Sequence, residues 1–237
     1  MRRSGGIIVR ARQMATGTLR QEKTQLRKAI RAKVAKLSTG EIQEQSQSVT
    51  RQVLALKEYQ TAGAISVFLS MPGKEVSTTD VVRDALKAGK EVFVPYIYEV
   101  AVPEGRDKVM DMLRLRSESD LDSLKPDAWG IPTLSDDSVP LRQNALGGYG
   151  LESDSASLQL DLIFVPSVAF DHERRRLGHG RGFYDRYLER YSSAATRCGS
   201  QMPLLVGLAL APQLLPETDS IPVDDNDWLV DRIIAPM

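Results

Sequence analysis

The chain is poor in cysteine and has no long apolar run, and each shortage excludes a class of structure. Cys198 is the only cysteine in 237 residues, which excludes an intrachain disulfide and a cysteine-based zinc site. This usage is typical of a reducing compartment. No apolar run approaches the roughly 20 residues that a membrane-spanning helix needs. Lys and Arg number 31, as do Asp and Glu, so the balanced charge predicts neither nucleic-acid nor membrane binding.

Acidic residues are also missing from the first twenty positions. Five arginines stand there, and the remainder of the chain carries 26 basic against 31 acidic residues. An Arg-rich, acid-free start occurs in organelle presequences, but Ser4-Gly5-Gly6 and the short run Ile7-Ile8-Val9 make a poor amphipathic helix. We therefore expect residues 1–20 to be a disordered basic extension of a cytoplasmic protein, with a mitochondrial signal as the alternative.

Apolar periodicity predicts a helical N-terminal arm over residues 21–37, because apolar residues recur there on one face. Ser38 and Glu41 have the spacing of a capping box, which predicts the start of a second helix. A strand over 64–69, a helix over 81–88 capped by Asp80, and a strand over 91–94 closed by Pro95 follow. This strand–helix–strand order predicts a parallel sheet.

The second half of the chain continues the same alternation. We expect a loop over 101–108, an edge strand over 110–116, and later strands at 162–165, 204–210 and 229–234. Two polar stretches, 143–159 and 192–203, are predicted to be flexible insertions. The composition, 42% hydrophobic and 26% charged, is ordinary for a globular protein. The prediction is one three-layer α/β domain over residues 21–237, with a mainly parallel sheet and a helical N-terminal arm.

Three alternate glycines lie between the strand at 162–165 and a helical pattern that runs through Leu188. Glycine allows backbone N–H groups to approach an anion closely, and a helix N-terminus adds unpaired N–H groups and positive partial charge. Gly178, Gly180 and Gly182 therefore predict a phosphate site, with a plain tight turn as the alternative. The spacing fits neither the dinucleotide fingerprint nor the P-loop.

Residues 161–188, DLIFVPSVAFDHERRRLGHGRGFYDRYL, resemble the signature segment of the 5-formyltetrahydrofolate cyclo-ligases, also called methenyltetrahydrofolate synthetases. Three further segments match in the expected order: KTQLR at 23–27, FLSM at 68–71 with Glu75 following, and WGIP at 129–132. The resemblance covers roughly residue 22 to the C-terminus. It implies ATP-dependent cyclisation of 5-formyltetrahydrofolate to 5,10-methenyltetrahydrofolate, with phosphorylation of the formyl oxygen and release of ADP and phosphate.

The resemblance also implies site residues. Those for ATP are Lys23, Arg27, Arg176, Gly178, His179, Gly180, Arg181, Gly182, Tyr184 and Asp185. Those for the folate are Leu69, Met71, Glu75, Trp129, Gly180, Gly182 and Phe183, the last standing where the family often has Tyr. Tyr184 and Arg181 are the expected catalytic residues, and Asp185 and Asp227 the expected Mg²⁺ ligands. The expected partners are the two small-molecule substrates, with no nucleic acid, no membrane and a monomeric chain.

Each of these residues also has a plainer interpretation. Lys23 and Arg27 fit a solvated helix face, Glu75 an exposed loop, Trp129 a cover over the core edge, and the acidic run around Asp227 a solvated turn. Asp171 is expected to cap backbone N–H groups. Two rival functions remain: a diverged enzyme acting with ATP on another carbonyl or formamide substrate, and a catalytically silent binding protein, including an RNA-binding module that uses the arginines at 174–176.

Overall fold

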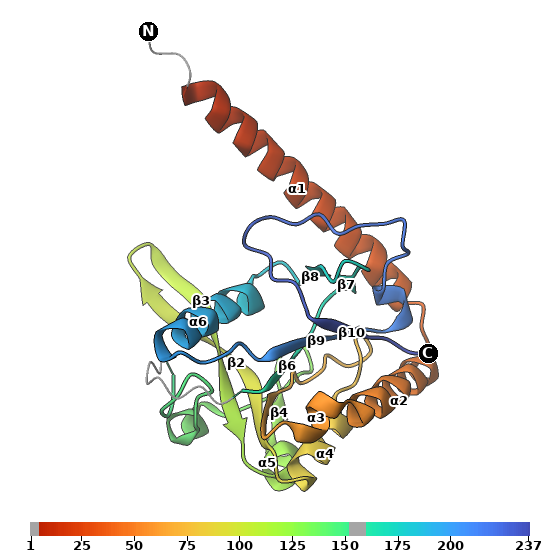
Figure 1. Ribbon diagram of the computed structural model, residues 1–237, viewed down its shortest axis with the longest axis vertical. Helices are drawn as coiled ribbons and strands as arrows, with labels where there is room; N and C mark the ends of the chain where they lie inside the picture. Colours follow the sequence, from red (N-terminus) through yellow and green to blue (C-terminus); the bar gives the residue numbers. More distant parts are fainter. Residues whose placement is uncertain (1–4, 152–159) are drawn as a thin grey trace.

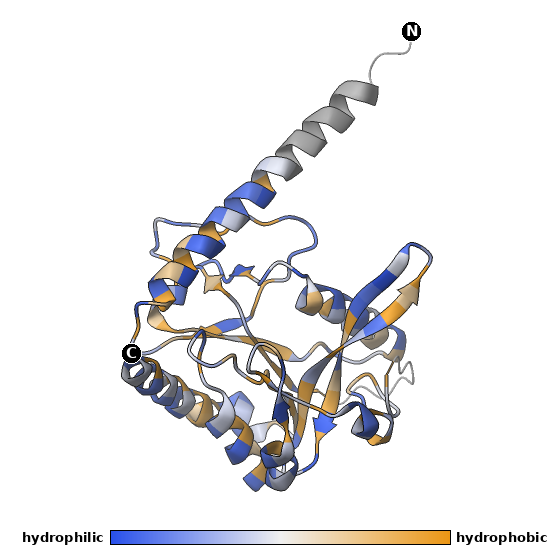
Figure 2. Ribbon diagram, turned by 180° about the vertical axis from the view of Figure 1, so that it is seen from behind, coloured by the Kyte–Doolittle hydropathy of each residue, from blue (hydrophilic) through white to orange (hydrophobic). Residues whose placement is uncertain are grey.

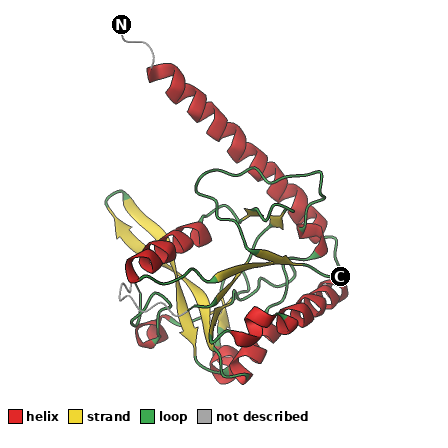
Figure 3. Cartoon of the chain, viewed as in Figure 1, coloured by secondary structure: helices red, strands yellow, loops and turns green. Residues whose placement is uncertain are grey.

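The structure, a computed structural model, describes residues 5–151 and 160–237, with side chains described from Gly17 onward. Its centre is a six-stranded sheet of order β10-β9-β6-β1-β2-β3 (Figures 1 and 3). Every neighbouring pair is parallel except β2 and β3, which form an antiparallel hairpin. The strands are β1 Ala64–Ser66, β2 Glu91–Val102, β3 Gly105–Leu115, β6 Leu162–Val165, β9 Leu204–Leu208 and β10 Arg232–Ile234. The three-layer α/β prediction is confirmed.

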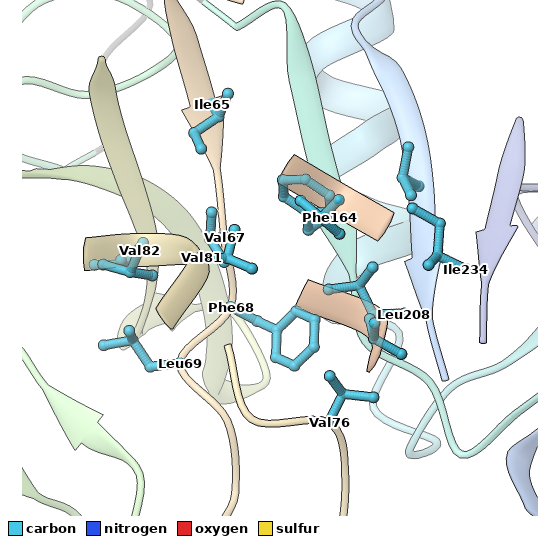
Figure 4. Packing of buried hydrophobic residues seen from close by; sticks show 14 of the residues in the cluster. Ile65, Val67, Phe68, Leu69, Val76, Val81, Val82, Phe164, Leu208 and Ile234 are labelled. Atoms are coloured by element: carbon cyan, nitrogen blue, oxygen red, sulfur yellow. The ribbon is translucent and has the colours of Figure 1, made fainter. Parts of the chain in front are cut away.

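Alternate side chains of the central strands point to opposite faces, and each face has its own apolar cluster. On one face, Ile65 and Phe164 pack with residues of α1 (Gly5–Val34), α2 (Thr39–Ala55) and α4 (Thr79–Lys87). Figure 4 shows part of this cluster, and in Figure 2 the sheet strands are largely orange. On the other face, Ile163 packs against α6 (Phe183–Cys198). Both faces being covered explains why the strand sequences are continuously apolar.

Shorter elements connect the main ones. They are helices α3 Lys57–Thr61 and α5 Glu118–Ser123, the 3₁₀ turns η1 Asp136–Leu141 and η2 Ala211–Gln213, and two small antiparallel pairs, β4 Lys125–Pro126 with β5 Pro132–Thr133 and β7 Ala169–Phe170 with β8 Arg176–Leu177.

Helix α1 begins at Gly5, so residues 5–20 do not form the disordered extension that we expected. No proline occurs before Pro72, and an interior glycine such as Gly17 costs a helix only about 1 kcal/mol, so the helix continues upstream of its apolar stripe. Residues 1–4 lie outside the described part. The second helix does begin at the predicted capping box, where Glu41 N donates to Ser38 Oγ (3.2 Å) and Ser38 N donates to Glu41 Oε2 (2.8 Å).

Two boundaries differ from the sequence prediction. Helix α4 has Thr78 at its N-cap, so Asp80 lies within the first turn and is not the cap. Strand β2 continues through Pro95 to Val102, and residues 101–108 belong to the hairpin. Proline is tolerated at position 95 because the ladder between β2 and β1 ends at Phe93, which leaves no partner that needs its missing N–H.

The two expected insertions are largely structured. Residues 143–151 fold onto β3, with Asn144, Ala145 and Leu146 buried and Ala145 N donating to Met112 O (2.9 Å). The rest of the first insertion, 152–159, lies outside the described residues. Residues 192–198 extend α6, which ends at Gly199 in a left-handed conformation. No helix in the described part is both long and apolar enough to cross a bilayer.

Candidate active site

The glycine bend, residues 178–182, joins β8 to the N-terminus of α6. Gly182 is the N-cap residue of α6 with φ 65°, and Gly180 has φ 100°, so both positions favour glycine. A Cβ on Gly180 would lie 3.3 Å from Arg27 Cζ, and one on Gly178 would lie 3.2 Å from Arg176 Nη1. The missing side chains therefore let two guanidinium groups approach the backbone of the bend.

Helix α1 lies along the bend and presents cations to it. Arg27 Nε donates to the carbonyl of Gly178 (2.8 Å), and Arg31 Nη2 lies 3.4 Å from His179 Nδ1. Lys23, Arg27 and Arg31 are spaced four residues apart and so share one helix face. Arg31 was not among the sequence candidates, although the repeated i, i+4 spacing from Lys23 was a signal that could have found it.

Burial, helped by neighbouring positive charge, lowers the pKa of two residues at the bend. Desolvation lowers the pKa of Arg27, the nearby charge of Arg31 lowers it further, and Asp227 acts in the opposite direction. Desolvation also lowers the pKa of His179, helped by the charges of Arg31, Arg27 and Lys74. The neutral imidazole is therefore favoured at this position, which leaves the surrounding cations to attract an anion.

Asp224 and Asp227 lie beside Lys23, and a third acidic residue, Asp185, lies on α6. Lys23 Nζ lies 2.5 Å from Asp227 Oδ2 and 3.3 Å from Asp224 Oδ2. On α6, Asp185 accepts a hydrogen bond from the buried guanidinium of Arg176, and the Trp228 N–H lies 3.3 Å from the same carboxylate. The backbone next to Asp227 thus touches Asp185, which brings both expected metal ligands into one region.

Glu75 is buried, contrary to the exposed-loop alternative. It follows β1 and accepts a hydrogen bond from Met71 N (2.6 Å). Burial raises the pKa of this carboxyl to about 7, because the Met71 hydrogen bond compensates only part of the desolvation.

Tyr184 connects Glu75 to the bend. Burial raises the pKa of its hydroxyl, and the charge of Glu75 raises it further, so the two groups lie close together. Its ring centroid is 6.0 Å from Arg176 Cζ. The Tyr184 hydroxyl and Arg176 Nε are buried polar atoms for which the described residues supply no hydrogen-bond partner. Unpaired buried polar atoms of this kind point to a ligand.

The remaining folate candidates differ in how exposed they are and in how they contact the loop that carries Glu75. Trp129 is 67% exposed, which rules out the core-cover alternative, and Lys74 Nζ lies 6.0 Å from its ring centroid. A Cβ on Gly130 would lie 3.5 Å from Pro72, so this loop packs against the Glu75 loop. Leu69 belongs to the apolar core (Figure 4). Met71 is half-buried, and its backbone N–H donates to Glu75.

Each of the three arginines at 174–176 contacts a group of the same chain. Arg174 donates to Asp231 O, Arg175 pairs with Asp171 and Glu173, and Arg176 is buried against Asp185.

Asp171 accepts hydrogen bonds from the N–H groups of Glu173, Arg175 and Ile221, which confirms its predicted capping role.

These features define an α/β protein with a glycine bend lined by cations and a buried carboxyl on the loop after β1. The family model of the 5-formyltetrahydrofolate cyclo-ligase family matches residues 19–236, and the chain belongs to this family. A Mus musculus protein named 5-formyltetrahydrofolate cyclo-ligase is 34% identical over 221 residues, which cover 93% of this chain and 97% of that protein. A Schizosaccharomyces pombe protein, named probable 5-formyltetrahydrofolate cyclo-ligase, is 33% identical over 216 residues, covering 91% and 95%.

A solved structure has the same fold. It is that of Aquifex aeolicus 5,10-methenyltetrahydrofolate synthetase, which matches with a TM-score of 0.63 at 28% identity and covers 90% of this chain and 88% of that chain. Family and fold therefore agree.

Proposed function

We propose that this chain activates 5-formyltetrahydrofolate by transferring the γ-phosphoryl group of ATP to its formyl oxygen, and then closes the ring. Membership of the family makes the chain a 5-formyltetrahydrofolate cyclo-ligase, which uses ATP to convert 5-formyltetrahydrofolate into 5,10-methenyltetrahydrofolate. The observation that best supports the mechanism is the glycine bend, where Arg27 donates to the carbonyl of Gly178 and which leads into Tyr184, whose buried hydroxyl has no partner among the described residues.

The chemistry explains why ATP is required. Ring closure must expel the formyl oxygen, and oxide is a very poor leaving group. Transfer of the phosphoryl group forms a bond from that oxygen to phosphorus and breaks the bond to ADP. The nitrogen at position ten then attacks the formyl carbon and loses its proton, while the C–O bond breaks and phosphate leaves. Such a transfer asks the protein mainly for positioning and for neutralisation of charge.

The α1 side of the bend fits the nucleotide. Free backbone N–H groups at the bend and the start of α6 bind phosphate oxygens. Arg27 suits bidentate phosphate contact, while Lys23 acts as a point charge. Arg176, His179 and Arg181 complete the charged rim. In this proposal the exposed Arg181 neutralises charge that develops on the transferred group.

The Glu75 side of the bend fits the pterin. The carboxylate can accept two N–H bonds from an aminopyrimidinone edge, and the exposed ring of Trp129 offers a face for a flat aromatic group. Tyr184, kept neutral by its raised pKa, donates its unpaired hydroxyl to the formyl or phosphoryl oxygen. Its neighbour Phe183, which lacks a hydroxyl, contributes packing alone.

Asp185 and Asp227 fit a Mg²⁺ ion that arrives with the nucleotide, because Mg²⁺ favours one or two carboxylates together with phosphate oxygens and water. Bound there, the ion would supply charge neutralisation at the phosphates. The described residues contain no ready-made cluster of three metal-ligating side chains, which agrees with a site completed by the ligand itself.

The test is to mix the purified chain with 5-formyltetrahydrofolate and MgATP and to follow the methenyl absorbance. We expect a signal that depends on both substrates and an equal yield of ADP. A chain that consumes ATP only with another formamide would support the diverged enzyme, and one that binds both ligands without turnover would support the silent binder. A cytoplasmic monomer remains our prediction.

A further inference from the structure

The turn at residues 71–74 follows β1 and ends at an exposed lysine, Lys74. A proline at its second position and a glycine with φ 72° at its third are typical of a type II turn, in which Lys74 N donates to Met71 O (3.2 Å). The chain is anchored on both sides of the turn, because Leu69 and Val76 are buried in the core (Figure 4). The backbone of Lys74 is therefore held in a fixed place.

A second turn, which carries Trp129, packs against the first. It is held by Asp127, whose carboxylate accepts a hydrogen bond from Trp129 N (2.8 Å). The two turns are in contact, since a Cβ on Gly130 would lie 3.5 Å from Pro72. Lys74 Nζ lies over the Trp129 ring, 6.0 Å from its centroid. Two restrained turns thus set where the ammonium of Lys74 lies.

The ammonium of Lys74 has no carboxylate partner within the described part of the chain, and its contact there is the Trp129 ring. A cation is held only weakly over an exposed ring, and the 6.0 Å separation is at the outer limit of such contacts. A hydrogen bond between an ammonium and an anion is stronger. The ammonium can therefore exchange the ring for an anionic ligand at little cost.

The charge of Lys74 also reaches the glycine bend. Burial lowers the pKa of His179, and the charges of two α1 arginines and of Lys74 lower it further. The arginines approach from α1, whereas Lys74 comes from the loop that carries Glu75, so the bend receives positive charge from two separate elements. Lys74 thus acts on the bend proposed for ATP and directly precedes the carboxyl proposed for the pterin.

We propose that Lys74 is a further catalytic residue, whose ammonium binds the phosphoryl group while it passes from ATP to the formyl oxygen. This inference rests on the proposed function. The transferred group must lie between a nucleotide at the bend and a pterin at Glu75. As the bond from the formyl oxygen to phosphorus forms and the bond from phosphorus to ADP breaks, the ammonium donates hydrogen bonds to an oxygen of the transferred group and keeps its own protons.

The experiment replaces the charge and keeps a long polar side chain, as in Lys74→Gln. A contact that is made only while the group is transferred lowers kcat and leaves KM unchanged. We expect kcat to fall roughly ten- to a hundredfold. The KM values for ATP and for 5-formyltetrahydrofolate should stay within about twofold of those of the unaltered chain. Lys74→Arg keeps the positive charge on a flexible stem and should recover most of the lost kcat.

The matched control is Lys57→Gln, at an exposed lysine on α3, which should leave kcat unchanged. The Tm of Lys74→Gln should also be unchanged, because the altered side chain is exposed and forms no ion pair within the described residues.

A normal kcat in Lys74→Gln would overturn the inference. A raised KM at normal kcat would also overturn it by making Lys74 a binding residue only, and Lys74→Arg as slow as Lys74→Gln would exclude the charge as the cause. No turnover by the unaltered chain would instead refute the proposed function.

Discussion

Lys23 Nζ and Asp227 Oδ2 lie 2.5 Å apart, with the two side chains only 13% and 20% exposed. One residue is proposed to bind a nucleotide phosphate and the other the metal that accompanies it. A nucleotide with its Mg²⁺ offers each member of this pair a new partner of opposite charge. Binding would exchange one ion pair for two, so little electrostatic energy is lost when the pair separates.

Lys23→Gln should therefore weaken the binding of ATP more than the binding of folate. A hydrogen bond to a charged group contributes about 1.5 to 3 kcal/mol, which corresponds to a rise in the KM for ATP of roughly ten- to a hundredfold. The folate KM should change little. Lys28→Gln, an exposed lysine five residues along α1, is the control and should leave both constants unchanged. Steady-state kinetics with each substrate varied would check this, and an unaltered KM for ATP would remove Lys23 from the nucleotide site.

Asp185→Asn should abolish activity and also lower stability. The carboxylate is the ion-pair partner of the buried Arg176, and breaking a buried pair costs about 3 kcal/mol or more. Activity must therefore be measured well below the Tm of the variant, with circular dichroism confirming that it is folded. Near-normal turnover of the folded variant would exclude Asp185 as a metal ligand, whatever the change in Tm.

The sequence predicted the parts of the fold that depend on local periodicity. The capping box at Ser38 and Glu41 and the apolar strands beneath it follow from near-neighbour chemistry, and the structure contains them. The sequence did not predict that β2 would continue past Pro95. Tolerance of that proline depends on β1 ending early, which is a property of the neighbouring strand. Likewise, residues 192–198 are polar yet helical because they extend a helix that is already anchored by Tyr187 and Leu188.

The site likewise has features that the sequence predicted and features that it did not. The glycine spacing and the Lys23–Arg27 stripe were visible in the chain, and the resemblance supplied the roles. The burial of Glu75 was not visible, since it depends on how the 71–75 loop folds back on Met71 N. Neither was the contact between the β2–β3 hairpin and α6, because residues 106–108 looked like a loop and only the register of β2 with β3 brings them to α6.

Gly180→Ala should lower the stability of the chain and should also weaken ATP binding. Gly180 has φ 100°, and an added methyl would lie 3.3 Å from Arg27 Cζ, so the change both strains the backbone and displaces the guanidinium. Strain from a left-handed conformation alone costs about 1 to 2 kcal/mol. Gly89→Ala is the control, since Gly89 has φ 73° with no atom near its added Cβ and lies between α4 and β2 rather than in the bend. Both variants should lose stability, but only Gly180→Ala should raise the KM for ATP; equal kinetics would refute the close-approach argument.

Glu75→Gln should remove a pH dependence of stability. The pKa of Glu75 is raised from 4.5 to about 7, so the folded chain binds a proton that the unfolded chain releases between these values. The resulting stability is fully present below pH 4.5 and is lost as the pH rises through about 7.

Between pH 5 and pH 8 the loss is about 2 to 3 kcal/mol, at 1.36 kcal/mol per pKa unit. Urea unfolding at both pH values should show this loss in the unaltered chain and in the exposed control Glu44→Gln, but not in Glu75→Gln. If Glu75→Gln and the unaltered chain lose stability equally, the carboxyl is ionised throughout. Since a pterin N–H edge binds the carboxylate form, the folate KM of the unaltered chain should also fall as the pH rises through 7, and Glu75→Gln should lose that fall along with most of its folate affinity.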